Sequence, residues 1–278
     1  MKYRHAFHAG NFADVTKHVV LVAALLRLTE KDRPLFLLET HAGRGRYQVA
    51  ARGGEAEHGI GRLLAAKPAT VHPALARYLE IVRGMNPDGE LRTYPGSPLI
   101  EVAFLRAGDR AAFCELQEVE AEGLRYELHG DSRIGVHCRD GFEALGALVP
   151  PPEKRGLALI DPPYEDTDAD FARVADALAE AAARWPQGVL MAWYPIKQGE
   201  VAARLHRKLL GAGVKRLLAA ELCVYPDDSR AGLNGSGIVT INPPWRFEQD
   251  LHQLLPVLHA ALAEGGSGRT RVALLAGE

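Results

Sequence analysis

Short, continuously apolar segments alternate with helix-forming segments along most of the chain, and this alternation most constrains the fold. Residues 35–39, 157–160 and 189–194 are apolar at nearly every position. Such runs are typical of strands buried on both faces of a parallel sheet. The sequence therefore predicts an α/β protein with a Rossmann-like, mostly parallel, doubly wound sheet. Functional residues of such sheets follow the carboxyl ends of the strands.

One stretch, residues 47–96, interrupts the alternation. It is rich in glycine, contains helical pieces, and shows no readable buried strand. We interpret it as an inserted, mainly helical subdomain in a core formed by residues 1–46 and 97–278. The expected strands are 35–39, 111–116, 134–138, 157–160, 189–194, 217–224 and 237–241, and the expected helices are 13–28, 63–66, 73–82, 119–128, 171–183 and 201–210.

Carboxylates end three successive expected strands. Glu39 is followed by the turn Gly43-Arg44-Gly45, where the backbone can approach a ligand closely. If the insertion is set aside, Glu115 ends the second strand and Asp140-Gly141 follows the third. Such acids would accept hydrogen bonds from a ribose diol and an adenine amino group. Gln48 replaces the third glycine of the dinucleotide fingerprint, which favours S-adenosylmethionine over NAD. For Glu115, a solvated strand end is an equally good interpretation.

The most informative motif is Asp161-Pro162-Pro163-Tyr164, directly after an apolar strand. The prolines fix the backbone and leave the Pro162 carbonyl free to accept a hydrogen bond. Asp161 and that carbonyl would each accept one N–H of an exocyclic amine, and Asp161 could also take the released proton. Tyr164 would stack on an extruded base. A proline-rich loop with an incidental aspartate is the structural alternative.

A similar motif, Asn242-Pro243-Pro244-Trp245, follows a later apolar strand. In a doubly wound sheet the fourth strand lies beside the first, whereas the last strand usually lies further out. Asp161 follows the fourth expected strand, and Asn242 follows the last. We therefore interpret the second motif as structural.

Four longer blocks resemble the RlmJ family, whose members methylate N6 of one adenosine in 23S ribosomal RNA. They are Tyr3–His18, Thr40–Tyr47, Tyr94–Pro98 and Ile160–Tyr164, and the resemblance extends over essentially the whole chain. It implies S-adenosylmethionine as cofactor and 23S rRNA, single-stranded or flipped out at the target adenosine, as partner. It also implies that Asp161 is the catalytic carboxylate and that the cofactor contacts His18, His41, Ser97, Glu115, Asp140 and Gly141.

The resemblance further implies that Tyr3, His5 and Lys17 approach the substrate nucleotide. From the residues alone, Tyr3 and neighbouring basic side chains suit single-stranded or splayed-out RNA, although a terminus packed on the body is the alternative. We assign Gly43 to the cofactor turn and Pro162 and Tyr164 to the catalytic motif. Arg44 departs from the family pattern, so its side chain must point away from the cofactor, or the turn is altered.

Charge and cysteine content limit the environment. The formal net charge is −2, but residues 1–46 carry +4 and the remainder −6. A near-neutral chain with one basic segment predicts modest nonspecific RNA affinity. Three widely spaced cysteines outside any CxxC pair fit a reduced, cytoplasmic protein. No metal site, membrane association or obligate protein partner is expected.

Two other classes of function remain open. DNA adenine or protein glutamine would be alternative substrates for the same chemistry, although a glutamine enzyme would normally carry Asn-Pro-Pro-Tyr at the fourth strand. A catalytically silent RNA-binding module is the other alternative, and the intact motif at Asp161 counts against it.

Overall fold

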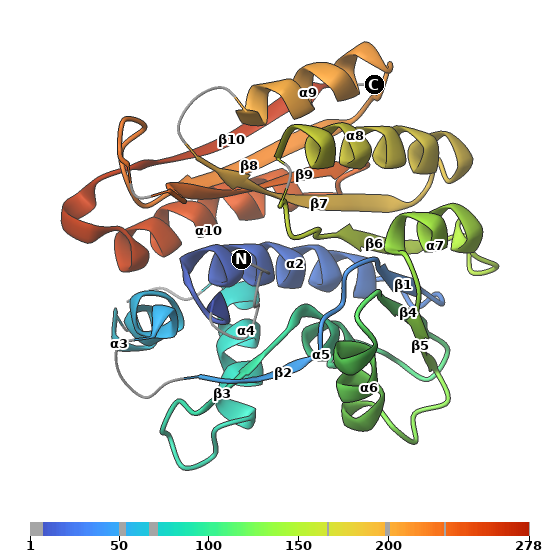
Figure 1. The fold of residues 1–278 in the computed structure, drawn as a ribbon, viewed down its shortest axis with the longest axis horizontal. Helices are drawn as coiled ribbons and strands as arrows, with labels where there is room; N and C mark the ends of the chain where they lie inside the picture. The colour runs from blue at the N-terminus through green and yellow to red at the C-terminus, as the bar shows by residue number, and fades with distance from the viewer. Residues whose placement is uncertain are drawn as a thin grey trace.

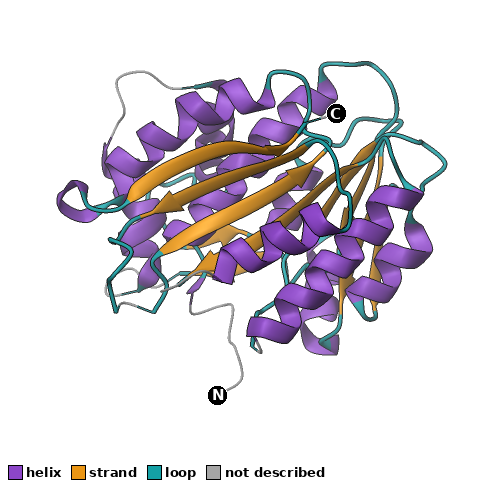
Figure 2. Ribbon diagram, turned by 90° about the horizontal axis from the view of Figure 1, so that it is seen from above, coloured by secondary structure: helices purple, strands orange, loops and turns teal. Residues whose placement is uncertain are grey.

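The computed structural model describes residues 8–49, 54–66, 72–165, 167–197, 201–230 and 232–277. Its centre is an eight-stranded sheet with helices on both faces (Figures 1 and 2). The strand order is β10-β8-β9-β7-β6-β1-β4-β5. The predicted Rossmann-like α/β fold is therefore confirmed. The strands are β1 (Phe36–Glu39), β4 (Arg110–Glu115), β5 (Ile134–Cys138), β6 (Gly156–Ile160), β7 (Val189–Ile196), β8 (Leu217–Cys223), β9 (Gly235–Ile241) and β10 (Arg269–Ala276).

Two hydrophobic cores, one on each face, hold the helices against the sheet. Alternate strand residues feed the two cores: Leu157 and Leu159 point to one, Ala158 and Ile160 to the other. The first core contains α2 (Phe12–Thr29), α4 (Pro73–Gly84), α6 (Glu118–Glu127) and α10 (Phe247–Leu262), and the second contains α7 (Gly141–Leu148), α8 (Thr167–Arg184) and α9 (Val201–Gly211). Figure 1 shows α8 and α9 above the sheet and α2 and α10 below it.

Strand direction decides which loops meet. Strands β5, β4, β1, β6 and β7 are parallel, so the segments that follow Glu39, Glu115, Cys138 and Ile160 emerge at one edge. Strand β9 is antiparallel to β7. Its carboxyl end, followed by Asn242, therefore lies at the opposite edge. The second Pro-Pro motif therefore lies at the edge opposite to Asp161, although β9 lies between β7 and β8 rather than further out as expected; its structural role stays a prediction.

The segment 47–96 contains more strand than the sequence predicts. Strands β2 (Arg46–Gln48) and β3 (Thr93–Pro95) form a two-stranded antiparallel sheet in which buried Tyr47 pairs with buried Tyr94. The expectation of no buried strand is therefore wrong, because three residues are too few to show a strand period. The pairing brings the two ends of the segment together, which supports our proposal that it is an insertion. The remaining elements in this part of the chain are η1 (Glu57–Gly61), α3 (Arg62–Ala66) and, just beyond it, α5 (Ser97–Val102).

The segment does not form a separate core. Leu75, Tyr78 and Leu79 of α4 belong to the same buried cluster as the α2 side chains. Helices α5, α7 and α10 and strand β10 were not predicted from the sequence. Among the described residues, no helix is long and apolar enough to cross a membrane.

Candidate active site

Helix α2 carries a buried lysine to the edge of the sheet at which Asp161 lies. The Asn11 side chain caps the helix by accepting hydrogen bonds from the backbone N–H groups of Ala13 and Asp14, each at 2.9 Å. One turn into the helix, Lys17 is only 4% exposed. Its Nζ donates to Asp161 Oδ2 at 2.6 Å and lies 3.0 Å from Asp14 Oδ1. Burial opposes the charge, but the two carboxylates outweigh it and raise the pKa of Lys17 well above its ordinary value.

Hydrogen bonds to the neighbouring segments after β1 and in β7 hold the end of β6 and the turn that follows it. Asp161 directly follows buried Ile160, and the β1 end is joined to the same strand by the Thr40 N–H, which donates to Leu159 O at 3.1 Å. Tyr164 adopts a left-handed φ of 50°, and its hydroxyl donates to Trp193 O at 2.6 Å.

The Tyr164 ring is 4% exposed and packs against Phe171 and Trp193, with ring centroids 4.8 and 5.7 Å away. The structure therefore gives Tyr164 an anchoring role in the turn. Its predicted role as a base-stacking surface stays a prediction.

The glycine turn and the second-strand acid are joined directly. Gly43 and Gly45 both have positive φ, at 61° and 80°, where glycine is favoured. The Gly43 N–H donates to Glu115 Oε2 at 2.9 Å, and Glu115 Oε1 accepts from the Gln117 N–H at 2.8 Å. Arg44 points away from this turn and forms a bidentate pair with Glu120 of α6, both bonds at 2.7 Å. Although Arg44 differs from the family pattern, its side chain therefore does not cover the glycine turn.

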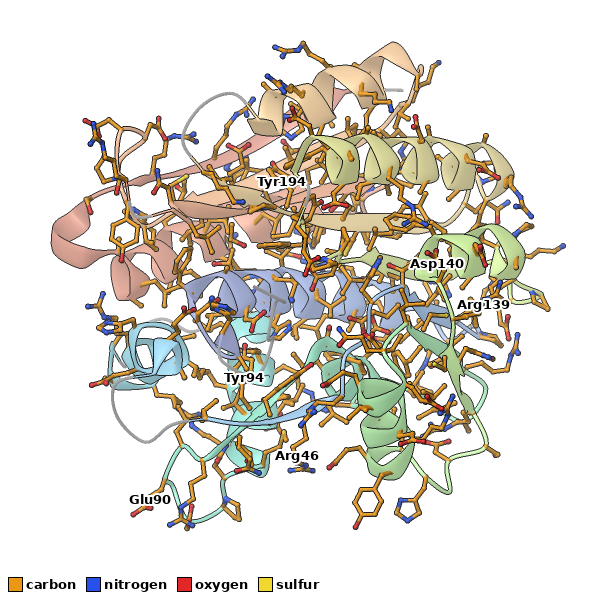
Figure 3. All side chains as sticks on the ribbon, in the orientation of Figure 1. Arg46, Glu90, Tyr94, Arg139, Asp140 and Tyr194 are labelled. Carbon is orange, nitrogen blue, oxygen red and sulfur yellow. The ribbon has the colours of Figure 1, made fainter. Side chains whose placement is uncertain are left out.

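Asp140 lies where α7 begins (Figure 3). Its Oδ1 accepts from the N–H groups of Phe142 and Glu143, and its Oδ2 accepts from Arg173 at 2.8 Å. Burial alone would raise the pKa of Asp140, but these hydrogen bonds and the Arg173 charge lower it, so the carboxylate is charged at neutral pH.

Gly141 allows α7 to approach the end of β1. A Cβ at this position would lie 1.9 Å from Thr40 O, which is too close for any other residue. The close approach places Asp140 beside the β1 turn. Contact of Gly141 with a cofactor stays a prediction.

The predicted histidines and Ser97 lie around the same edge. His41 Nδ1 is 2.7 Å from Thr40 Oγ1, and burial lowers the pKa of His41 to about 4, so the ring is neutral at physiological pH. His18 Nδ1 is 2.8 Å from Tyr94 Oη, and the two rings stack. Ser97 donates through Oγ to Glu39 Oε1. The structure thus gathers residues from α2, β1, α5, β4, α7 and β6.

Sequence reasoning missed one member of this site, Glu101 of α5. Glu39 and Glu101 are both fully buried. Within the described ranges, Glu39 Oε2 and both carboxyl oxygens of Glu101 have no hydrogen-bond partner. Burial and the nearby Glu101 charge raise the pKa of Glu39, and burial raises that of Glu101 to about 8. The sequence offered no signal, because Glu101 lies inside a short helix rather than at a strand end.

This burial predicts a pH-dependent effect of Glu101→Gln. The pKa of Glu101 is about 8 in the folded chain, against an ordinary value of 4.5. Because the folded chain binds this proton more tightly than the unfolded chain, protonated Glu101 stabilises the fold fully below about pH 4.5. This contribution falls by about 1.4 kcal/mol for each pH unit above that value and is lost as pH rises through 8. We expect the melting temperature of Glu101→Gln, relative to wild type, to rise by several degrees between pH 5 and pH 8. A difference that is equal at both pH values would contradict this.

Tyr3 and His5 lie outside the described residues. Across the ranges that the structure does describe, no group of three or more histidine, cysteine, aspartate or glutamate side chains is arranged to hold a metal ion. Lys17 is buried and contacts Asp161, and its predicted approach to the substrate nucleotide stays a prediction.

Comparisons with known proteins identify the family. A family model described as "Ribosomal RNA large subunit methyltransferase D, RlmJ" matches residues 32–275. The chain is 41% identical to ribosomal RNA large subunit methyltransferase J of Escherichia coli, with 100% of both chains covered, and 40% identical to that of Haemophilus influenzae, with 96% of both covered. A crystal structure of a Legionella pneumophila protein superposes with a TM-score of 0.89 at 34% identity, covering 96% of this chain and 98% of that chain. The chain therefore belongs to the RlmJ family of ribosomal RNA large subunit methyltransferases.

Proposed function

We propose that this protein transfers a methyl group from S-adenosylmethionine to N6 of an adenosine in 23S ribosomal RNA. The observation that carries the proposal is the position of Asp161. It follows β6 at the edge where the β1 glycine turn emerges, and buried Lys17 holds one of its carboxyl oxygens. The Asp161 carboxylate is thus a fixed hydrogen-bond acceptor, and it lies next to a turn suited to an adenosine-containing cofactor.

The polar groups at this edge fit S-adenosylmethionine. Glu115 and Asp140 present carboxylates for a ribose diol and an adenine amino group. Leu116, 65% exposed, follows Glu115 and offers an apolar surface for a flat ring. Ser97 hydrogen-bonds to the buried Glu39 carboxyl at the end of β1, beside this edge. We further assign His18, His41, Gly43, Ser97 and Gly141 to the cofactor site, together with Asp161.

S-adenosylmethionine, when bound, supplies an electrophilic methyl group attached to a sulfonium sulfur. The protein's part is to orient the adenine amino group toward it. Lys17 occupies Asp161 Oδ2, and no described residue donates a hydrogen bond to Oδ1. Asp161 Oδ1 accepts one N–H of the amino group, and the Pro162 carbonyl accepts the other. This pair draws the N6 lone pair out of conjugation with the ring. As the new N–C bond forms and the bond between the methyl carbon and the sulfonium sulfur breaks, with its electron pair staying on sulfur, Asp161 accepts the proton that N6 releases.

A labelled methyl donor tests the proposal. The protein is incubated with it and unmodified 23S rRNA, duplex DNA or a release-factor-type protein, and the products are digested and identified. We expect labelled N6-methyladenosine from rRNA alone. Label found only on DNA or protein would overturn the rRNA assignment, and RNA binding without any labelled product would indicate the catalytically silent module. An rRNA substrate is consistent with a cytoplasmic enzyme.

A further inference from the structure

The Asn-Pro-Pro-Trp turn, which the proposed reaction does not use, lies at the edge of the sheet opposite to Asp161. Ile241, the last residue of β9, pairs with Leu190 near the start of β7. Strand β7 has eight residues and runs parallel to β6. Ile160 pairs with Ala192 and Ile241 pairs with Leu190, so at about 3.3 Å per residue Asp161 and Asn242 are offset by roughly 13 Å along the strands and lie two strands apart. The turn therefore leaves the sheet at the edge opposite to Asp161.

Hydrogen bonds tie this turn to two neighbouring loops. Asn242 Nδ2 donates to Pro186 O at 2.9 Å and to Gly188 O at 3.0 Å. The Asn242 N–H donates to Arg216 O at 3.0 Å. On the other side, Trp185 Nε1 donates to Lys154 O at 2.8 Å. The loops before β6, β7 and β8 and the turn after β9 thus form one ordered surface.

Three basic residues of this surface have backbone conformations that favour glycine. The φ angles of Lys154, Arg216 and Arg246 are 61°, 49° and 64°. A side chain at positive φ is strained, and glycine would relieve that strain. The chain nevertheless carries a long cationic side chain at each position, and all three are exposed. These side chains therefore do not serve the local backbone conformation, which indicates a role in binding rather than in folding.

The same cations lack ion-pair partners, and the turn that links their loops carries an exposed aromatic ring. Among the described residues, none of Lys154, Arg216 and Arg246 forms an ion pair, and Arg246 makes only a 3.4 Å contact with the neutral Gln249. Trp245 is 83% exposed. The adjacent acid, Glu248, lies 4.0 Å from His252. Cations bind phosphate, and an indole stacks on bases of any sequence.

We propose that this surface, defined by Lys154, Arg216, Trp245 and Arg246 and called here the Trp245 surface, binds the RNA substrate at a second place, at the edge of the sheet opposite to Asp161. The nature of the nucleic acid rests on the proposed function. A protein partner would be expected to cover a broader apolar patch than one ring among cations. Because the surface lies at the opposite edge, it contributes to the affinity for a large folded RNA and not to methyl transfer itself.

The test replaces the three strained cations with the residue that their backbone favours. The triple variant Lys154→Gly, Arg216→Gly, Arg246→Gly keeps or raises the melting temperature, so a loss of binding cannot be ascribed to unfolding. For an rRNA domain that can span both edges, we expect Kd to rise at least tenfold at low salt. The slope of log Kd against log salt should become shallower by about 2–3, since each lost phosphate contact contributes about 0.9. Trp245→Ala should weaken binding without changing this slope.

A short oligonucleotide containing only the target adenosine is the internal control, and the variants should bind and methylate it like wild type. Exposed Arg83 and Arg125, each changed to alanine, provide matched removals of charge elsewhere. An unchanged Kd and salt slope for the large RNA in the triple variant would overturn the proposal. So would an unchanged RNA affinity combined with an altered oligomeric state in Trp245→Ala. Binding is measured without S-adenosylmethionine, so that failure of the methylation assay and failure of this inference are distinguishable.

Discussion

Asp161→Asn is expected to lower kcat by about 10³-fold or more while leaving the affinity for S-adenosylmethionine within a few-fold of wild type. The asparagine amide has the size of the carboxylate but accepts through one oxygen only and cannot take up the proton from N6. Losing one oriented group that acts in the transition state costs about 10²–10³-fold, and losing the proton acceptor adds to this. Single-turnover methylation of rRNA measures the rate, and calorimetry measures the cofactor affinity.

A matched aspartate distinguishes a catalytic effect from a general effect of charge. Asp176 of α8 pairs with Lys208 on the protein surface at 2.8 Å. Asp176→Asn should methylate rRNA at the wild-type rate. If Asp161→Asn retained more than a tenth of wild-type turnover, Asp161 would not be the group that positions N6.

Lys17→Met is the second variant with a large expected effect. The Lys17 ammonium is buried between Asp14 and Asp161, so its removal leaves two neighbouring carboxylates without a counter-charge. Breaking a buried pair in this way costs about 3–5 kcal/mol of folding stability. The two carboxylates would then share a proton at neutral pH. We expect a lower kcat and an acidic limb of the pH–rate profile that moves to higher pH.

A second substitution separates positioning from substrate binding. Asp14→Asn in the Lys17→Met background removes one of the two repelling charges, and we expect it to recover part of the lost stability and to return the acidic limb toward the wild-type position. A lysine that contacts RNA phosphate would behave differently. In that case Lys17→Met would raise KM for rRNA, leave kcat and the pH profile unchanged, and gain nothing from Asp14→Asn.

The sequence predicts best those site residues that directly follow a strand. Glu115, Asp140 and Asp161 follow apolar runs, so their meeting at one edge follows from the parallel sheet alone. Glu101 could not be found in this way. Its importance comes from its burial against Glu39, and that neighbour is distant in sequence.

The two Pro-Pro motifs show a further limit. As sequences they are alike, since each follows a buried strand. Strand count distinguishes them in the sequence, but strand direction is what places them at opposite edges of the sheet. Direction depends on how the chain returns after β8, and no local pattern encodes it. The turn at Asn242 then acquires its own surroundings, in which strained cations accompany an exposed indole.

The sequence by itself determined the fold class, the positions of most strands along the chain and the motif at Asp161, because periodicity and turn chemistry are local properties of the chain. Only the tertiary structure decided what lies beside each side chain. It showed that Lys17 binds Asp161, that Arg44 points to Glu120, and that Tyr164 is buried. These pairings join residues distant in sequence, and burial sets their electrostatics. The charge state and orientation of the site are therefore properties of the packed chain.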